Sequence, residues 1–264
     1  MSKGISKTFR EAEIGGAISR LVYDLTSPPL PPGEERTRAV AKFRAAREGT
    51  LAIVQNLSQE QADFSPRAGV WSIGQNVEHL LLTEQLYRIQ MQNMIELARQ
   101  GGRHNIALTF EEIDNSIALI PRDVIPKLTL PLNMLNMIVP RVVRVALIRT
   151  PFVPALNPTA SSPKRGQPIA ALRARAVASL NTTEEIFRGE LPAGLMDVTL
   201  SHPIFGVNNI AHILGILAAH EDRHHWQIKS VVANPLFPPD ALKSLFQLAE
   251  EKSLADNSTG TKGR

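Results

Sequence analysis

The chain has 264 residues, no cysteine and a formal net charge of +4. Its length is sufficient to bury a hydrophobic core without disulfide bonds. The lack of cysteine excludes a thiol nucleophile, an iron–sulfur cluster and cysteine-ligated zinc, so any metal site must use His, Asp or Glu. A charge of +4 over this length is weak evidence for a nucleic-acid partner, and we expect none.

Residues 1–32 are predicted to be an N-terminal extension, because no helix can cross the proline-rich run at 28–32. Residues 1–20 carry charged side chains where a secretory signal needs an apolar core, so we expect a cytoplasmic protein. The best membrane candidate, residues 128–148, contains two prolines and two arginines, which argue against a membrane span.

Helical patterns follow the extension. The first helix is predicted over roughly residues 34–57, where apolar side chains recur at steps of three and four or their sums. Capping-box patterns at Ser58 and Ser72 indicate a short helix and then a long one over residues 73–100. The glycine pair at 101–102 would end the long helix.

Residues 103–167 are rich in proline and too long for a simple loop, so we expect a crossover that carries its own short helices. A third long helix follows Pro168 and runs to about Arg188. Residues 201–207 are predicted to be a loop, and an asparagine then caps a last helix that ends near residue 233.

No strand alternation and no internal repeat is evident, so the sequence predicts an all-α protein. Its four long helices are expected to form a four-helix bundle with a long crossover between the second and third bundle helices. We therefore expect a helical domain over residues 33–235, including the 103–167 crossover, and a C-terminal tail over 236–264 that is disordered from about residue 256. The oligomeric state is open, and a homodimer is one alternative.

The last helix contains a pair of histidines that are candidate metal ligands. His220 and His224 are four residues apart, so they share one face, on a stripe that is otherwise apolar and faces the predicted interior. Two buried imidazoles need partners, because an unpaired buried polar group costs about 1–3 kcal/mol. A metal ion would satisfy both rings. The alternative is a pair of core histidines bonded to backbone or water.

A metal needs at least a third ligand, and His79 is the best candidate, two turns into the helix over 73–100. Taken alone, it could equally be a hydrogen-bonded core histidine. Gln75 could line the same cavity, although its capping role is the stronger interpretation. His225 is expected at the surface or beside the ligands, and His212 lies off the shared face.

Residues 220–224, His-Glu-Asp-Arg-His, also match the His-Glu-x-x-His pattern of zinc peptidases, in which the Glu is a general base. The third histidine of the extended pattern is absent, so Glu250 or Glu251 would have to be a distant third ligand. Glu221 is the candidate catalytic residue, and Glu78, next to His79, could take a similar role. For both carboxylates a surface ion pair is the alternative.

Three stretches resemble the DinB-like (DinB/YfiT-like) superfamily of metal-dependent enzymes: 57–79, ending in WSIGQNVEH; 202–206, HPIFG; and 219–228, AHEDRHHWQI. The resemblance covers roughly residues 35–233 and implies a four-helix bundle of DinB/YfiT type with a long connection between its second and third helices. In that family one histidine from the second bundle helix and two from the last form a facial metal triad. The resemblance therefore implies His79, His220 and His224 as metal ligands.

Family members with known activity include transferases and isomerases that use low-molecular-weight thiols. The resemblance thus implies a metal-dependent enzyme that acts on a small-molecule substrate, as a thiol-dependent transferase or a metal-assisted hydrolase. A non-catalytic, stress-related protein that binds a metal or small ligand and a zinc peptidase are the alternatives. A three-histidine site suits Zn, Ni or Fe(II) and leaves positions open for water or substrate. Arginines 141, 144 and 149 could bind an anionic substrate, although a solvated face is the stronger interpretation.

Overall fold

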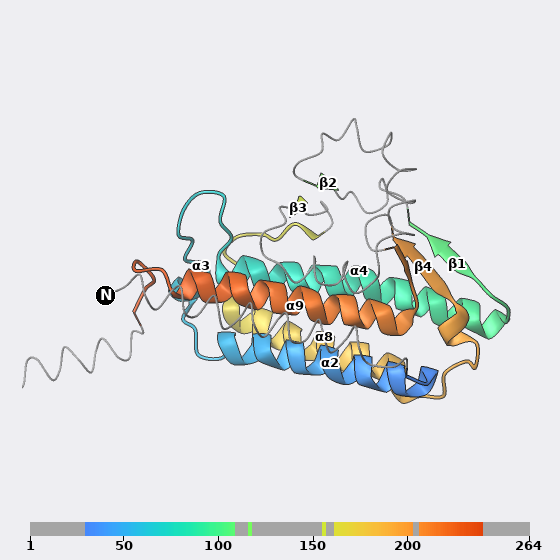
Figure 1. The fold of residues 1–264 in the computed structure, drawn as a ribbon. Coiled ribbons are helices and arrows are strands. Elements are labelled where there is room, and N and C mark those ends of the chain that lie inside the picture. Colours follow the sequence, from blue (N-terminus) through green and yellow to red (C-terminus); the bar gives the residue numbers. More distant parts are fainter. Residues whose placement is uncertain (1–29, 109–115, 118–154, 157–160, 203–205, 240–264) are drawn as a thin grey trace, which may run out of the picture.

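Figure 1 shows a computed structural model of the chain, which describes residues 30–108, 116–117, 155–156, 161–202 and 206–239. The described part is mostly helical, as the sequence predicts. Residues 1–29 of the predicted extension, most of the predicted crossover and the tail from residue 240 lie outside the described residues. The membrane candidate at 128–148, the three crossover arginines, Glu250 and Glu251 also lie outside them.

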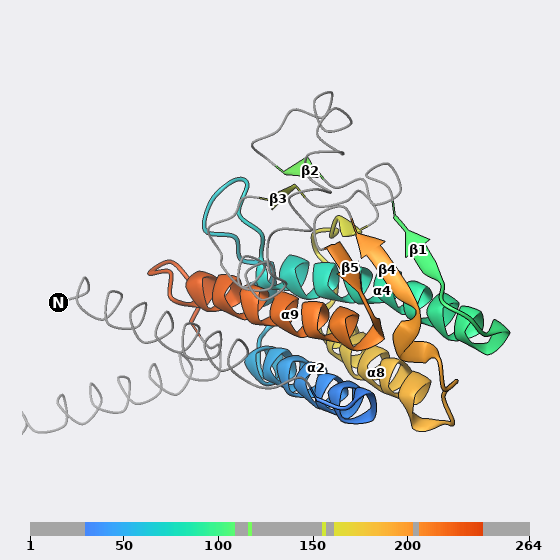
Figure 2. The same cartoon turned by 45° about the vertical axis from the view of Figure 1, so that its right-hand side comes forward.

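Four long helices of the described part lie side by side (Figures 1 and 2). Helices α2 and α4 each pack against both α8 and α9. Their bounds are α2 Pro32–Val54, α4 Ile73–Gln100, α8 Ile169–Arg188 and α9 Ile210–Val232, and the short helix α3, Gln59–Asp63, precedes α4. Helix α4 has its predicted bounds, whereas α2 ends three residues before the predicted position.

The predicted helix signals are present as hydrogen bonds. Ser58 and Ser72 each accept a bond from a backbone N–H three residues on, and the glutamine at that position bonds back to the serine N–H. Asn209 and His212 form the same reciprocal pair at the start of α9. Gly101 caps the C-terminal end of helix α4, and its φ of 78° is a left-handed conformation that favours glycine.

A small sheet lies beside the helices, in strand order β1-β4-β5. Strand β4, Thr199–His202, pairs in parallel with β1, Asn105–Ala107, and antiparallel with β5, Gly206–Asn208. A separate antiparallel pair joins β2, Ser116–Ile117, to β3, Ala155–Leu156. The prediction of a loop over 201–207 is therefore wrong at both ends, because strands this short show too little alternation for a period of two to be detected.

The buried core contains two apolar clusters, and each receives side chains from all four long helices. The first includes Phe43, Met91, Leu180 and Ile213, and the second includes Val54, Val77, Leu172 and Ile228. Along α2, α4 and α9, buried polar residues stand between the positions that feed the two clusters. These residues are Arg47, Thr50, Glu84, Glu221 and His224. A polar layer thus lies between the two apolar clusters.

Arg47 is fully buried at the centre of this layer. Its Nη2 atom lies 2.9 Å from Glu84 Oε2 and 2.5 Å from Glu221 Oε1, and its Nε donates to Glu221 Oε1 at 2.7 Å. Thr50 also donates to Glu221, and Thr183 donates to Glu84. Burial alone would lower the pKa of Arg47, but the two carboxylates raise it above its ordinary value, so the guanidinium stays charged. One side chain of α2 therefore links α4 to α9.

Among the described residues, no helix is both long enough and apolar enough to cross a membrane.

Replacing Arg47 with Ala should lower the free energy of unfolding by about 3–5 kcal/mol, because it leaves Glu84 and Glu221 buried without their cation. Urea unfolding of the full chain measures this. The matched control is Arg99→Ala, which removes an exposed ion pair with Glu96 and should cost less than about 1 kcal/mol. Equal losses in the two variants would contradict the role given to Arg47.

Candidate metal centre

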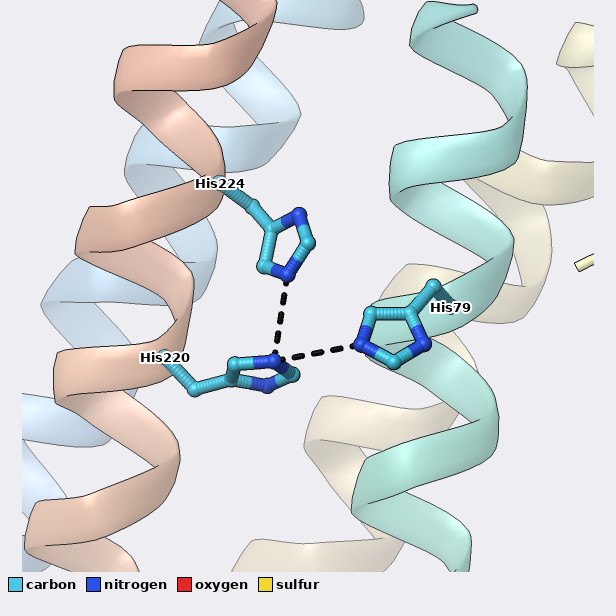
Figure 3. A group of neighbouring side chains, drawn as sticks. All are labelled: His79, His220 and His224. Carbon is cyan, nitrogen blue, oxygen red and sulfur yellow. Dashed lines mark hydrogen bonds between the residues drawn. The ribbon is translucent and has the colours of Figure 1, made fainter. Parts of the chain in front are cut away.

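Three imidazole rings converge from two helices (Figure 3). His79 lies in the second turn of α4, and His220 and His224 lie four residues apart in α9. The Nε2 atom of His220 is 3.2 Å from Nε2 of His79 and 3.1 Å from Nε2 of His224. His79 and His224 are only 2% and 3% exposed, and His220 is partly exposed. The structure thus brings together the three histidines that the sequence analysis selected.

Two of the rings are fixed from behind by hydrogen-bond acceptors. Nδ1 of His79 lies 2.7 Å from the carbonyl oxygen of Ser161, which can only accept, so Nδ1 carries the proton. Nδ1 of His224 lies 2.7 Å from Oδ1 of Asn76, whose amide nitrogen donates to the Ser72 carbonyl at 2.8 Å. In both rings the Nε2 atom therefore presents a lone pair to the centre of the group.

The spacing of the three nitrogens fits a divalent metal ion. Ligand nitrogens about 2.0–2.1 Å from a metal would be about 2.9 Å apart at octahedral angles and about 3.4 Å apart at tetrahedral angles. The two Nε2 separations from His220, 3.1 and 3.2 Å, fall between these values. All three ligand atoms lie within 4.8 Å of one another. Three histidines placed in this way could hold a metal ion.

The electrostatics of the group also favour ligation. Burial lowers the pKa of His79 to about 4, against a smaller opposing effect of the Ser161 carbonyl. Burial, reinforced by the neighbouring imidazoles and Arg223, holds the pKa values of His220 and His224 well below their ordinary value. All three rings are therefore neutral at neutral pH, which is the form that binds a metal.

Three further residues complete the surroundings and were not predicted as site residues. The ring of Trp71 lies 4.9 Å from that of His79 and stacks over His224 at 6.2 Å, between ring centroids. Asn76 and Ser161 supply the two acceptors described above. Asn76 had a detectable signal, since it stands one turn before His79 on the same helix. A main-chain carbonyl such as that of Ser161 leaves no signal in the sequence.

The other candidates occupy different positions. Glu221 is buried and bound to Arg47 and Thr50, and its carboxylate is not among the groups that converge with the histidines. Glu78 is also buried, so neither carboxylate lies at the surface. Gln75 is engaged in its capping box.

The remaining histidines of α9 do not join the group. His225 packs against α2, where its Nε2 lies 2.7 Å from Thr50 Oγ1. A Cβ added at Gly49 would lie only 2.9 Å from the His225 ring, so any other residue at this position would have to displace that ring. His212 caps α9 and lies 3.1 Å from a carboxylate oxygen of Glu35.

A model of the DinB superfamily matches residues 42–228, more than half of the chain. The chain belongs to the DinB superfamily. The three converging histidines all lie within the residues that the family model matches. The part of the chain that is similar to the DinB superfamily therefore includes the whole histidine group. Searches of the curated proteins and of the solved structures give no match.

The burial of His202 in β4 should make the stability of the folded chain depend on pH. It is 3% exposed, its ring lies 6.4 Å from that of Tyr87, and burial lowers its pKa from 6.5 to about 3. The unfolded chain therefore binds a proton here at a higher pH than the folded chain, and stability present above pH 6.5 is lost as the pH falls towards 3. Between pH 6.5 and pH 3, the free energy of unfolding should therefore fall less steeply in His202→Gln than in the wild type. The difference between the two slopes should reach up to about 1.4 kcal/mol per pH unit.

The measurement is the urea midpoint at successive pH values, with a chelator present so that metal binding does not contribute. His104→Gln is the control, because His104 lies beside the exposed end of α4, where its Nε2 contacts the Gly101 carbonyl. If His202→Gln and the wild type have the same pH dependence, His202 is not a buried neutral histidine.

Proposed function

We propose that the chain is a metal-dependent enzyme whose divalent ion is held by His79, His220 and His224. One observation carries the proposal. Hydrogen bonds at Nδ1 of His79 and of His224 leave the Nε2 lone pairs of both rings directed at the third imidazole, His220. A proton on Nε2 of His220 can serve only one of these two lone pairs at a time, whereas a cation at the centre would bind all three rings. The chain supplies this arrangement from two packed helices.

The proposed ion is Zn, Ni or Fe(II), since imidazole ligands suit all three. Three protein ligands leave coordination positions open, which is typical of a catalytic site rather than a structural one. A bound divalent ion would lower the pKa of a coordinated thiol or water and polarise a substrate. Trp71 would exclude water from the side of the site that it covers.

The proposed substrate is a small molecule, and the proposed reaction is thiol-dependent transfer, with metal-assisted hydrolysis as the second possibility within the same class. The resemblance to the thiol-using members of the superfamily supports this choice. The sequence adds a chemical reason, because a chain without cysteine must obtain any thiol nucleophile from a low-molecular-weight substrate. We place the site in a four-helix bundle of DinB/YfiT type over residues 33–235, with the 103–167 crossover between its second and third helices.

A non-catalytic metal-binding function is the second candidate. The burial of His79 and His224, with Trp71 against both rings, favours it because such a site limits access to the ion. The zinc-peptidase hypothesis has less support. Its general base would be Glu221, whose carboxylate is bound to Arg47 and Thr50 and buried away from the histidine group.

The test of the site is metal binding by the full chain, purified without a metal-binding tag and measured by elemental analysis and titration with zinc. The wild type should bind one ion per chain. His79→Ala, His220→Ala and His224→Ala should each weaken binding by more than about 100-fold, because loss of a partner behind a ligand alone costs about 10–100-fold. His104→Ala and His212→Ala should bind like the wild type.

Wild-type binding in all three ligand variants would overturn the proposed site. Turnover distinguishes the two functional candidates: metal-loaded wild type and His79→Ala are assayed with a panel of low-molecular-weight thiols and an electrophilic aromatic acceptor. Turnover by the wild type alone supports the enzyme. Tight metal binding without turnover across the panel favours the non-catalytic function.

A further inference from the structure

The acceptor behind His79 belongs to the connecting segment that precedes α8, and not to a long helix. The Ser161 carbonyl lies 2.7 Å from Nδ1 of His79, and Ser161 is 1% exposed. The position of this carbonyl decides which nitrogen of His79 carries the proton. The tautomer of His79, with Nε2 unprotonated and able to bind a metal, therefore depends on the contacts that hold residues 161–164 against α4.

The acceptor behind His224 is held differently. Asn76 lies on α4, the same helix as His79, and its amide group donates to the Ser72 carbonyl one turn earlier. Helix α4 itself thus fixes the Asn76 oxygen. Ser161 lies outside the long helices, and a contact between its segment and α4 would give the Ser161 carbonyl a second point of attachment.

Glu78 provides such a contact. Its side chain is buried, and its Oε2 atom accepts a hydrogen bond from the backbone N–H of Lys164 at 2.5 Å. The contact needs only an acceptor oxygen at this position, which a carboxylate or an amide side chain supplies. Arg175 lies 4.0 Å from the other carboxylate oxygen, but with 46% of its side chain exposed it adds little.

Two neighbouring residues of α4 therefore form hydrogen bonds to the segment 161–164 at two points. His79 bonds to Ser161, and Glu78 bonds to Lys164 three residues later. Pro163 lies between the two contacts and restricts the backbone there. Fixing Lys164 consequently limits where the Ser161 carbonyl can lie.

We propose that Glu78 is a positioning residue that holds the segment 161–164 in place and thereby keeps the proton of His79 on Nδ1, with Nε2 free to bind a metal. This inference rests on the proposed metal site, but its first consequence concerns the metal-free protein. The role needs a hydrogen-bond acceptor at position 78 and not a negative charge. It therefore differs from that of a proton acceptor, which glutamine cannot replace.

The experiment uses two readouts on the full chain. In the metal-free, 15N-labelled protein, long-range proton–nitrogen correlation reports which nitrogen of His79 is protonated. Wild type and Glu78→Gln should show the proton on Nδ1, whereas Glu78→Ala should show a substantial population with the proton on Nε2. Zinc affinity should fall about 10–100-fold in Glu78→Ala and stay close to wild type in Glu78→Gln.

Two further variants control for general loosening of the chain. Lys164→Pro removes the same hydrogen bond from the opposite side and should reproduce the Glu78→Ala tautomer change. Gln59→Ala removes contacts to the Gln167 carbonyl and the Ile169 N–H, which lie beyond residue 164 at the start of α8. This variant should leave the tautomer of His79 unchanged.

Three results would overturn the inference: an unchanged His79 tautomer in Glu78→Ala and Lys164→Pro, equal losses of zinc affinity in Glu78→Gln and Glu78→Ala, or a tautomer change in Gln59→Ala. Failure of the proposed function is distinguishable. If wild type does not bind zinc but Glu78→Ala still shifts the proton, the metal site is wrong and the positioning role holds.

Discussion

The structure depends on two imidazole lone pairs that are directed at a third imidazole about 3 Å away. Each is held there by a hydrogen bond on the opposite side of its ring, from His79 to Ser161 and from His224 to Asn76. Nε2 of His220 carries at most one proton, so without a cation it can satisfy only one of these two lone pairs at a time. The fold must therefore supply enough packing around the histidines to keep them together before any cation binds.

That packing comes from the division of the core into two apolar clusters with a polar layer between them. Within the layer, Arg47 pairs with Glu84 on α4 and with Glu221 on α9. Such buried ion pairs add little net stability, but removing one partner is costly, so they resist rotation or sliding of the helices. Because Glu221 is next to His220, the same contacts that satisfy Arg47 also set the face that α9 presents to His79.

Local patterns in the sequence were sufficient to predict the long helices. Serine caps at Ser58 and Ser72 and the glycine at 101 act within one turn of chain, so their effect can be inferred from neighbouring residues. The histidine pair was likewise visible from its four-residue spacing. His79 could be added because its helix was well defined and because the resemblance to a known family indicated the same three residues.

Partners that are distant in sequence could not be predicted in this way. Arg47 stands four residues after Phe43 on the inward stripe of α2, which signals burial, but nothing local identifies Glu84 and Glu221 as its partners. The Ser161 carbonyl has no side-chain signal, and the strands β4 and β5 are too short to show alternation. What the sequence left open is therefore mainly the set of contacts that orient the histidines.

X-ray absorption at the metal edge of the zinc-loaded full chain tests the central claim most directly, because it reports the atoms bound to the ion. The account predicts three nitrogen ligands at about 2.0–2.1 Å, with the outer-shell scattering that imidazole rings produce. A first shell made of oxygen alone, without imidazole scattering, would contradict it.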